Sequence, residues 1–246
     1  MSTFLSDREQ VAYTMNFLRP HCVPGVEKVR VGPDKDGGYV ILGSADRFDA
    51  LVSLGIGECV EFDLIFADLG ARVVQYDHTI EGPPTSHHRF EFRRQKVGAG
   101  PGEASLAEII SRHSLRSCRS VFLKCDIEGS EWGLLADASS DDISCFEQVS
   151  IELHDFDHMT NINDRSLIFR VLEKINRTHA VIHVHVNNCG GSLTDIFGLP
   201  VPPVIEVTYV RRDVGPLVPS WEKFPTALDR PNCEWGEVYV GTFTYL

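Results

Sequence analysis

The 246-residue sequence contains no apolar run long enough to cross a membrane. Its first ten residues, MSTFLSDREQ, carry acidic and basic groups and no apolar core, so we expect no secretory signal peptide. The sequence has no internal repeat and no low-complexity linker. These absences predict one domain over residues 1–246, with residues 1–48 as an N-terminal lead-in, in the cytoplasm and with no membrane partner.

Basic residues are also scarce. The chain has 23 Lys and Arg against 35 Asp and Glu, a formal net charge of -12. Nucleic-acid binding depends on Lys and Arg contacts to phosphate, so this balance argues against a nucleic-acid partner. The one basic cluster, residues 89–96 (RFEFRRQK), alternates with Phe90 and Phe92 and is interpreted as a strand with a charged face.

Paired cysteine motifs are missing. The chain has seven cysteines, an odd number, and none is spaced as a CxxC pair. This usage favours reduced thiols over a disulfide framework or a zinc knuckle. The cysteines are Cys22, Cys59, Cys118, Cys125, Cys145, Cys189 and Cys233.

The sequence does contain enough apolar residues, 43%, for a sizeable core, arranged as alternating strand-like and helix-like segments. We predict helices over residues 7–19, 61–70, 106–113, 131–136 and 166–176. We predict strands over residues 29–31, 39–42, 51–54, 72–76, 90–97, 121–127, 148–153, 180–186, 204–210 and 237–244. This order is typical of a Rossmann-like α/β fold, a mostly parallel sheet with helices on both faces. The last strands lack a long helix between them, which predicts an exposed antiparallel edge through which two chains could pair as a homodimer.

The most informative stretch is residues 53–79, SLGIGECVEFDLIFADLGARVVQYDHT. An apolar strand runs into Gly55-Ile56-Gly57, a helical segment follows, and a second strand ends on Asp77. Parallel α/β sheets hold adenosine-bearing cofactors with this layout, and the acid accepts hydrogen bonds from ribose hydroxyls.

The same stretch lacks the third glycine of a dinucleotide motif, since Val60 stands there, and it lacks the Gly-Lys-Ser/Thr ending of a phosphate loop. S-adenosylmethionine, which has an adenosine but no pyrophosphate, fits this turn better than NAD or FAD. Two alternatives stay open: an NAD(P)-dependent oxidoreductase on the same sheet, and a non-catalytic cofactor-binding protein.

A second motif lies at residues 121–132, VFLKCDIEGSEW, where a buried strand delivers Asp126 and Glu128 at its carboxyl end. Here the chain resembles the FkbM-like family of S-adenosylmethionine-dependent methyltransferases, whose hallmark is this DIEGSE run. Runs at residues 32–42, 105–115, 149–154, 183–188 and 202–212 add to the resemblance by their order. It implies a class I methyltransferase with a seven-stranded sheet whose last strand is inserted antiparallel. It also implies O-methylation of a sugar or another small-molecule hydroxyl.

The resemblance further implies a cofactor site along the sheet edge. The glycine turn lines the methionine and ribose side, Asp77 accepts from the ribose, and the end of the third strand contacts adenine. The implied cofactor-binding residues are Gly55, Gly57, Glu58, Asp77, His78, Lys96 and Val97.

Methyl transfer to a hydroxyl requires removal of its proton, and the candidate bases are Asp126, Glu128, His154 and the pair His183 and His185. His154 follows a strand end, where a histidine with a pKa near neutrality suits a general base, although it can equally be a hydrogen-bonding strand-end histidine. Asp126, Glu128 and His154 are also candidate ligands for a divalent metal. Glu131 is expected to stabilise the N-terminus of its helix.

Acceptor contacts are the remaining expectation. His183 and His185 share one strand face, Asn187 follows them, and Tyr39 belongs to a turn that could close over the site. We interpret these four residues as substrate-binding. The alternatives are edge packing for the histidines and a plain structural turn before Tyr39.

Overall fold

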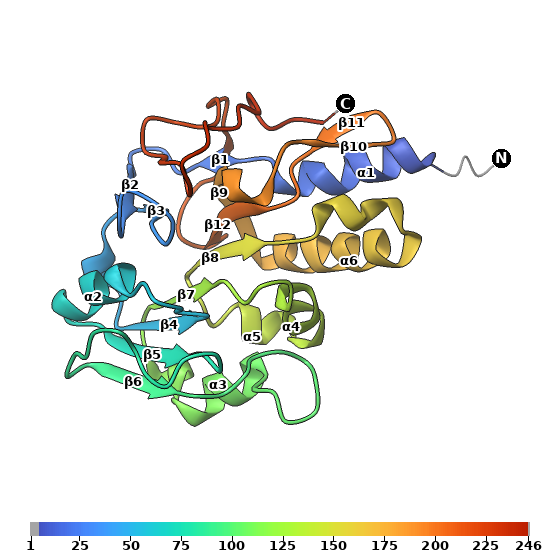
Figure 1. Cartoon of the computed structure of the whole chain (residues 1–246). Coiled ribbons are helices and arrows are strands. Elements are labelled where there is room, and N and C mark those ends of the chain that lie inside the picture. Colours follow the sequence, from blue (N-terminus) through green and yellow to red (C-terminus); the bar gives the residue numbers. More distant parts are fainter. Residues whose placement is uncertain (1–4, 246) are drawn as a thin grey trace.

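The computed structural model describes residues 5–245 and has a seven-stranded central sheet flanked by helices (Figure 1). The strand order is β6-β5-β4-β7-β8-β12-β9. The bounds are β4 (Ala50–Leu54), β5 (Arg72–Tyr76), β6 (Phe90–Arg93), β7 (Val121–Cys125), β8 (Gln148–Leu153), β9 (His179–Val186) and β12 (Ile205–Arg211).

The strand directions confirm the Rossmann-like fold class. β4 to β8 pair in parallel, whereas β12 runs antiparallel to both β8 and β9. The antiparallel strand is therefore inserted one place inside the edge. β5 lies on one side of β4 and β7 lies on the other, so the order in which strands are added to the sheet reverses between β4 and β7. In open α/β sheets, ligands bind outside the strand carboxyl ends at such a switch point.

Helices cover one face almost completely. α3, α4, α5 and α6 pack against one another there, and α1 packs on α6 (Figure 1). α3 begins at a capping box, in which the Ser105 side chain accepts from the Glu108 amide and the Glu108 side chain accepts from the Ser105 amide. The helices are α1 (Asp7–Met15), α2 (Glu61–Asp68), α3 (Leu106–Arg112), α4 (Glu131–Asp137), α5 (Ser140–Ile143) and α6 (Ile162–Thr178).

The opposite face is covered by α2, by the hairpin β2 (Lys28–Val31) and β3 (Tyr39–Leu42), and by the C-terminal segment, residues 220–245 (dark red in Figure 1). The strand predicted over residues 237–244 is wrong. Glu237 contacts the His185 side chain on the face of the sheet instead of pairing with a strand, and only an isolated bridge between Phe224 and Gly241 forms in this region.

Two small sheets complete the described chain: β1 (His21–Cys22) with β13 (Val218–Pro219), and β10 (Thr194–Ile196) with β11 (Leu199–Val201). The edge strand β9 is buried along its whole length. The homodimer was expected because that edge was thought to be exposed, and it stays a prediction without this support.

Candidate functional site

A row of polar side chains crosses the face that the hairpin covers. In register from β5 to β9, every member of the row is buried. Its members are Gln75, Ser53, Lys124, Ser150, Thr208 and His183. Since side chains alternate along a strand, the residues two positions nearer the carboxyl edge point to the same face.

That second row forms the candidate site. Strand register and the period of two place a carboxylate, a glycine or a histidine at each strand end. From β5 to β9 the row reads Asp77, Gly55, Asp126, Glu152, Glu206 and His185. Polar side chains are therefore gathered on one face of the sheet, and the second row of them lies at the carboxyl edge of the parallel strands.

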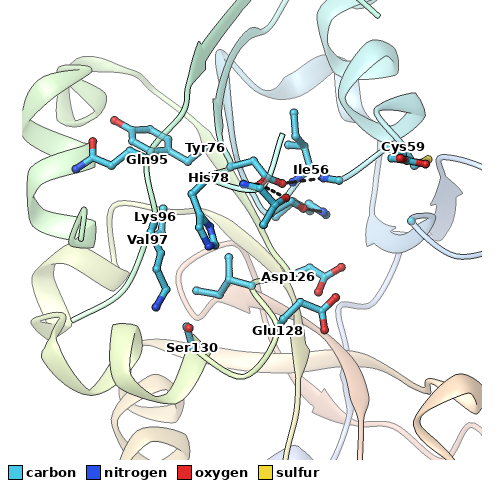
Figure 2. A pocket seen from close by; sticks show the side chains of 18 of the residues that line it. Ile56, Cys59, Tyr76, His78, Gln95, Lys96, Val97, Asp126, Glu128 and Ser130 are labelled. Atoms are coloured by element: carbon cyan, nitrogen blue, oxygen red, sulfur yellow. Dashed lines mark hydrogen bonds between the residues drawn. The ribbon is translucent and has the colours of Figure 1, made fainter. Parts of the chain in front are cut away.

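A cavity of about 290 Å³ opens over the first half of this row (Figure 2). Asp36 and Gly37, from the turn before β3, also border it. In Figure 2, Lys96 and Val97 lie on one side of the cavity, and Asp126 and Glu128 lie on the other. Nine predicted site residues line it: Gly55, Gly57, Glu58, Asp77, His78, Lys96, Val97, Asp126 and Glu128.

The two turn positions, Gly55 and Gly57, favour glycine for different physical reasons. Gly55 has φ +70°, and a Cβ there would lie 1.6 Å from the carbonyl oxygen of Asp126. Gly57 has φ +50°, and a Cβ there would meet nothing within 4 Å. Gly55 thus lets two strand ends approach closely, whereas Gly57 leaves open space beside the cavity.

Asp77 holds the glycine turn in place. Its Oδ2 accepts hydrogen bonds from the amides of Ile56 (3.1 Å) and Gly57 (2.9 Å), and its Oδ1 accepts from the amide (2.7 Å) and hydroxyl (2.6 Å) of Thr79. Burial acts to raise the pKa of the Asp77 carboxyl, but these hydrogen bonds outweigh it and lower that pKa. Four donors fill the acceptor positions of a carboxylate, so Asp77 would bind ribose hydroxyls only by releasing Thr79.

The cavity is acidic. Five carboxylates line it, those of Asp36, Glu58, Asp77, Asp126 and Glu128. Its two lysines are both engaged: Lys96 Nζ lies 2.7 Å from Glu103 Oε1, and Lys124 Nζ donates to the carbonyl oxygen of Gly55. Neither lysine is thus free to bind an anionic ligand.

His154 lies behind this cavity and does not line it. Its Nδ1 is 3.2 Å from Glu131 Oε1, and its Nε2 is 3.3 Å from Glu152 Oε1 and 3.6 Å from Glu128 Oε2. Burial acts to lower the pKa of His154, but the Glu131 and Glu152 carboxylates raise it to about 11. The value near neutrality expected of a general base is therefore absent here, because three carboxylates surround the ring.

The carboxylates of Asp126 and Glu131 meet His154 closely. One ligand atom from each of these three residues lies within 4.8 Å of the others. The predicted metal set had Glu128 in place of Glu131. Glu128 adopts φ +55° in the turn after β7, and its side chain is 86% exposed, whereas Glu131 is fully buried.

No protein-family model matches the chain, and no curated protein matches it. The family resemblance therefore rests on the sequence motifs alone. Among residues 5–245, no helix combines the length and apolar character needed to span a membrane.

The four predicted acceptor-binding residues lie outside the cavity. His183 pairs with Asp229 (2.7 Å), and His185 is held between Glu206 (2.9 Å) and Glu237 (3.0 Å). Both rings are buried under the C-terminal segment.

Asn187 and Tyr39 are buried in the same region. Asn187 donates from Nδ2 to Glu152 Oε1 at 2.9 Å. Tyr39 is also buried, and its hydroxyl has no hydrogen-bond partner. A bound acceptor could reach these groups only if the C-terminal segment or the β2–β3 turn moved.

Sequence reasoning missed Glu152 and Glu206, which face each other across β8 and β12. Burial, together with the neighbouring Asp126 and Glu206 carboxylates, raises the pKa of Glu152 to about 8. A signal was present: each is the single acid of its strand, in the runs QVSIEL and IEVTYVR, and both strands are buried. Acids at such positions are rare unless they are paired or functional.

Proposed function

We propose that this protein is an S-adenosylmethionine-dependent methyltransferase of the FkbM-like kind, acting on a hydroxyl of a sugar or another small molecule. The observation that carries the proposal is the acidic cavity over the Gly55–Gly57 turn, at the switch point between β4 and β7. Its volume of about 290 Å³ is at the lower end of the range for small-molecule sites.

Charge separates the two candidate cofactor classes. S-adenosylmethionine carries a sulfonium cation, whereas NAD carries a pyrophosphate with two negative charges. A cavity lined by five carboxylates and two engaged lysines attracts the first and repels the second. The first turn of α2, where a dinucleotide pyrophosphate would bind, also carries Glu61 and Asp63.

The lining residues fit the cofactor in distinct ways. The open space at Gly57 admits a ligand against the backbone, and Asp77 keeps that backbone rigid. Val97 is buried and apolar, which suits the face of an adenine ring, and exposed His78 lies nearby in the same cavity.

The bound cofactor would supply an electrophilic methyl group. The chain has to hold an acceptor oxygen in line with that group and accept the hydroxyl proton. Asp126 and Glu128 are the candidate bases whose carboxylates reach the cavity, whereas both nitrogens of His154 face carboxylates behind it. We therefore assign proton removal to the two carboxylates.

Isothermal titration calorimetry on the full chain tests the cofactor. We expect S-adenosylmethionine and S-adenosylhomocysteine to bind at least 100-fold more tightly than NAD⁺. Tight NAD⁺ binding without S-adenosylmethionine binding would overturn the proposal. Formation of S-adenosylhomocysteine in the presence of a panel of hydroxyl acceptors then separates an enzyme from a non-catalytic cofactor-binding protein.

A matched pair of variants locates the binding site. Gly57→Leu places a side chain in the cavity, and we expect it to weaken S-adenosylmethionine binding at least 30-fold. Gly241→Leu is the control, because Gly241 also has a positive φ (+66°) and open space around its Cβ but does not line the cavity. Equal affinities of the two variants would place the cofactor elsewhere.

A further inference from the structure

Three polar residues from three elements converge behind the cavity. Asp126 follows β7, His154 follows the neighbouring parallel strand β8, and Glu131 begins α4. Parallel strands end at the same sheet edge, so Asp126 and His154 are brought together by topology. The turn of residues 127–130 then returns the chain so that Glu131 points back at them, its Oε1 accepting from the Ile127 amide at 2.9 Å.

Each of the three residues has a buried polar atom that makes no hydrogen bond: Asp126 Oδ1, Glu131 Oε2 and His154 Nδ1, the last lying 3.2 Å from Glu131 Oε1. The Glu131 side chain is completely buried. Leaving a buried polar group unpaired costs about 1–3 kcal/mol, and most such groups in native proteins are satisfied. Carboxylate oxygens cannot donate hydrogen bonds to one another, so a cation that accepts lone pairs from all three atoms would satisfy the cluster.

We propose that Asp126, Glu131 and His154 bind a divalent metal ion. One imidazole nitrogen and two carboxylates form a mixed nitrogen–oxygen set, which suits Mn²⁺, Fe²⁺ or Zn²⁺ better than Ca²⁺. Three protein ligands leave coordination positions open for water or substrate.

The surroundings orient these ligands. The Ile127 amide fixes one Glu131 oxygen, and the Trp132 indole donates to the backbone carbonyl of His154 at 2.8 Å. Glu152 Oε1 lies 3.3 Å from His154 Nε2, which leaves Nδ1 for the metal. A carboxylate on the far nitrogen of a ligating histidine is a common arrangement in metal sites.

The role of the metal in catalysis rests on the proposed function, although metal binding itself does not. Asp126 lines the cofactor cavity and also belongs to the cluster, so a metal there would be adjacent to the acceptor position. It would hold acceptor hydroxyl oxygens in place and stabilise negative charge on them. Because Asp126 would then be a ligand, exposed Glu128 is the carboxylate left to take the proton.

Mn²⁺ is the probe that tests the site, with EDTA-treated full-length protein followed by electron paramagnetic resonance and calorimetry. We expect one Mn²⁺ per chain, bound at least tenfold more tightly than Ca²⁺. Glu131→Gln keeps the shape of the side chain and should weaken Mn²⁺ binding at least tenfold. His154→Gln should do the same, and Glu128→Gln, the matched control in the same motif, should change it less than threefold.

Thermal unfolding of each variant without metal verifies that it folds, and the increase in Tm with Mn²⁺ gives an independent measure of binding. Absence of stoichiometric Mn²⁺ binding overturns the proposal, as does equal binding by wild type and Glu131→Gln. S-adenosylmethionine titration of the EDTA-treated protein keeps the two proposals separate. Cofactor binding with no Mn²⁺ binding refutes the metal site alone.

Discussion

The contrast between Gly55 and Gly57 gives a quantitative test of how the turn is built. At Gly55, an alanine Cβ would lie 1.6 Å from the Asp126 carbonyl oxygen and 2.7 Å from its carbonyl carbon. Both atoms are backbone, and the Asp126 amide is itself bonded to the carbonyl of Leu54 at 2.9 Å. A normal contact would require the two strand ends to separate by about 1.4 Å.

Gly55→Ala therefore combines overpacking, about 1–3 kcal/mol, with a positive φ at a Cβ-bearing residue, about 1–2 kcal/mol. We expect the free energy of unfolding to fall by about 4 kcal/mol. Gly57→Ala has a positive φ but no clash, so its loss should be about 1 kcal/mol. The difference of about 3 kcal/mol is the contribution of the close approach alone.

Urea unfolding followed by tryptophan fluorescence measures both variants, since Trp132 is buried next to the site. Losses of stability within 1 kcal/mol of each other for Gly55→Ala and Gly57→Ala would contradict a close approach of the two strand ends at Gly55. A larger loss for Gly57→Ala than for Gly55→Ala would contradict it as well.

Three further predictions concern buried polar groups. Burial lowers the pKa of His179 from 6.5 to about 4, so the unfolded chain takes up this proton first. Neutral, buried His179 contributes about 3 kcal/mol of stability, which is fully present above pH 6.5 and lost as the pH falls to 4. His179→Gln should therefore flatten the stability–pH curve between these two pH values relative to wild type. Asp229→Ala leaves buried His183 without its carboxylate partner and should cost about 3 kcal/mol in urea unfolding, against less than 0.5 for exposed Asp137→Ala. Tyr39→Phe removes a buried hydroxyl without a partner, so Tm should stay equal or rise, and a fall above 3 °C would contradict this.

The sheet could be predicted from the sequence because its strands are local apolar runs and its helices carry local signals. Residues 121–127 are predicted as a buried strand because they form a nearly continuous apolar run, and β7 occupies the centre of the sheet. The strand predicted over residues 237–244 failed for a non-local reason. Alternating side chains there suit a strand, but pairing depends on a free edge, which no local pattern reveals.

The first half of the site was also predictable. Gly55, Asp77 and Asp126 each end a parallel strand, and topology alone brings such ends together. Glu131 was assigned only a helix-terminal role, because the turn that directs it toward His154 depends on Glu128 at a positive φ. His183 and His185 lie under the C-terminal segment, whose path has no signature in periodicity.

One electrostatic property underlies both proposals, and it leads to a last prediction. Asp126 belongs to the cavity and to the metal cluster, so the sulfonium and the metal ion would share its negative field. Occupation of one site by a cation should weaken the other by on the order of 1 kcal/mol, about fivefold in affinity. Linkage requires that Mn²⁺ weaken S-adenosylmethionine binding by the same factor as S-adenosylmethionine weakens Mn²⁺ binding.

Calorimetric titrations of each ligand, with and without saturation by the other, measure both factors. Glu131→Gln should abolish the effect of Mn²⁺ on S-adenosylmethionine binding, because its carboxylate belongs to the metal cluster and does not line the cavity. Glu128→Gln should keep that effect. A coupling that survives Glu131→Gln would mean that Mn²⁺ acts from another place, and the assignment of these three ligands would then be wrong.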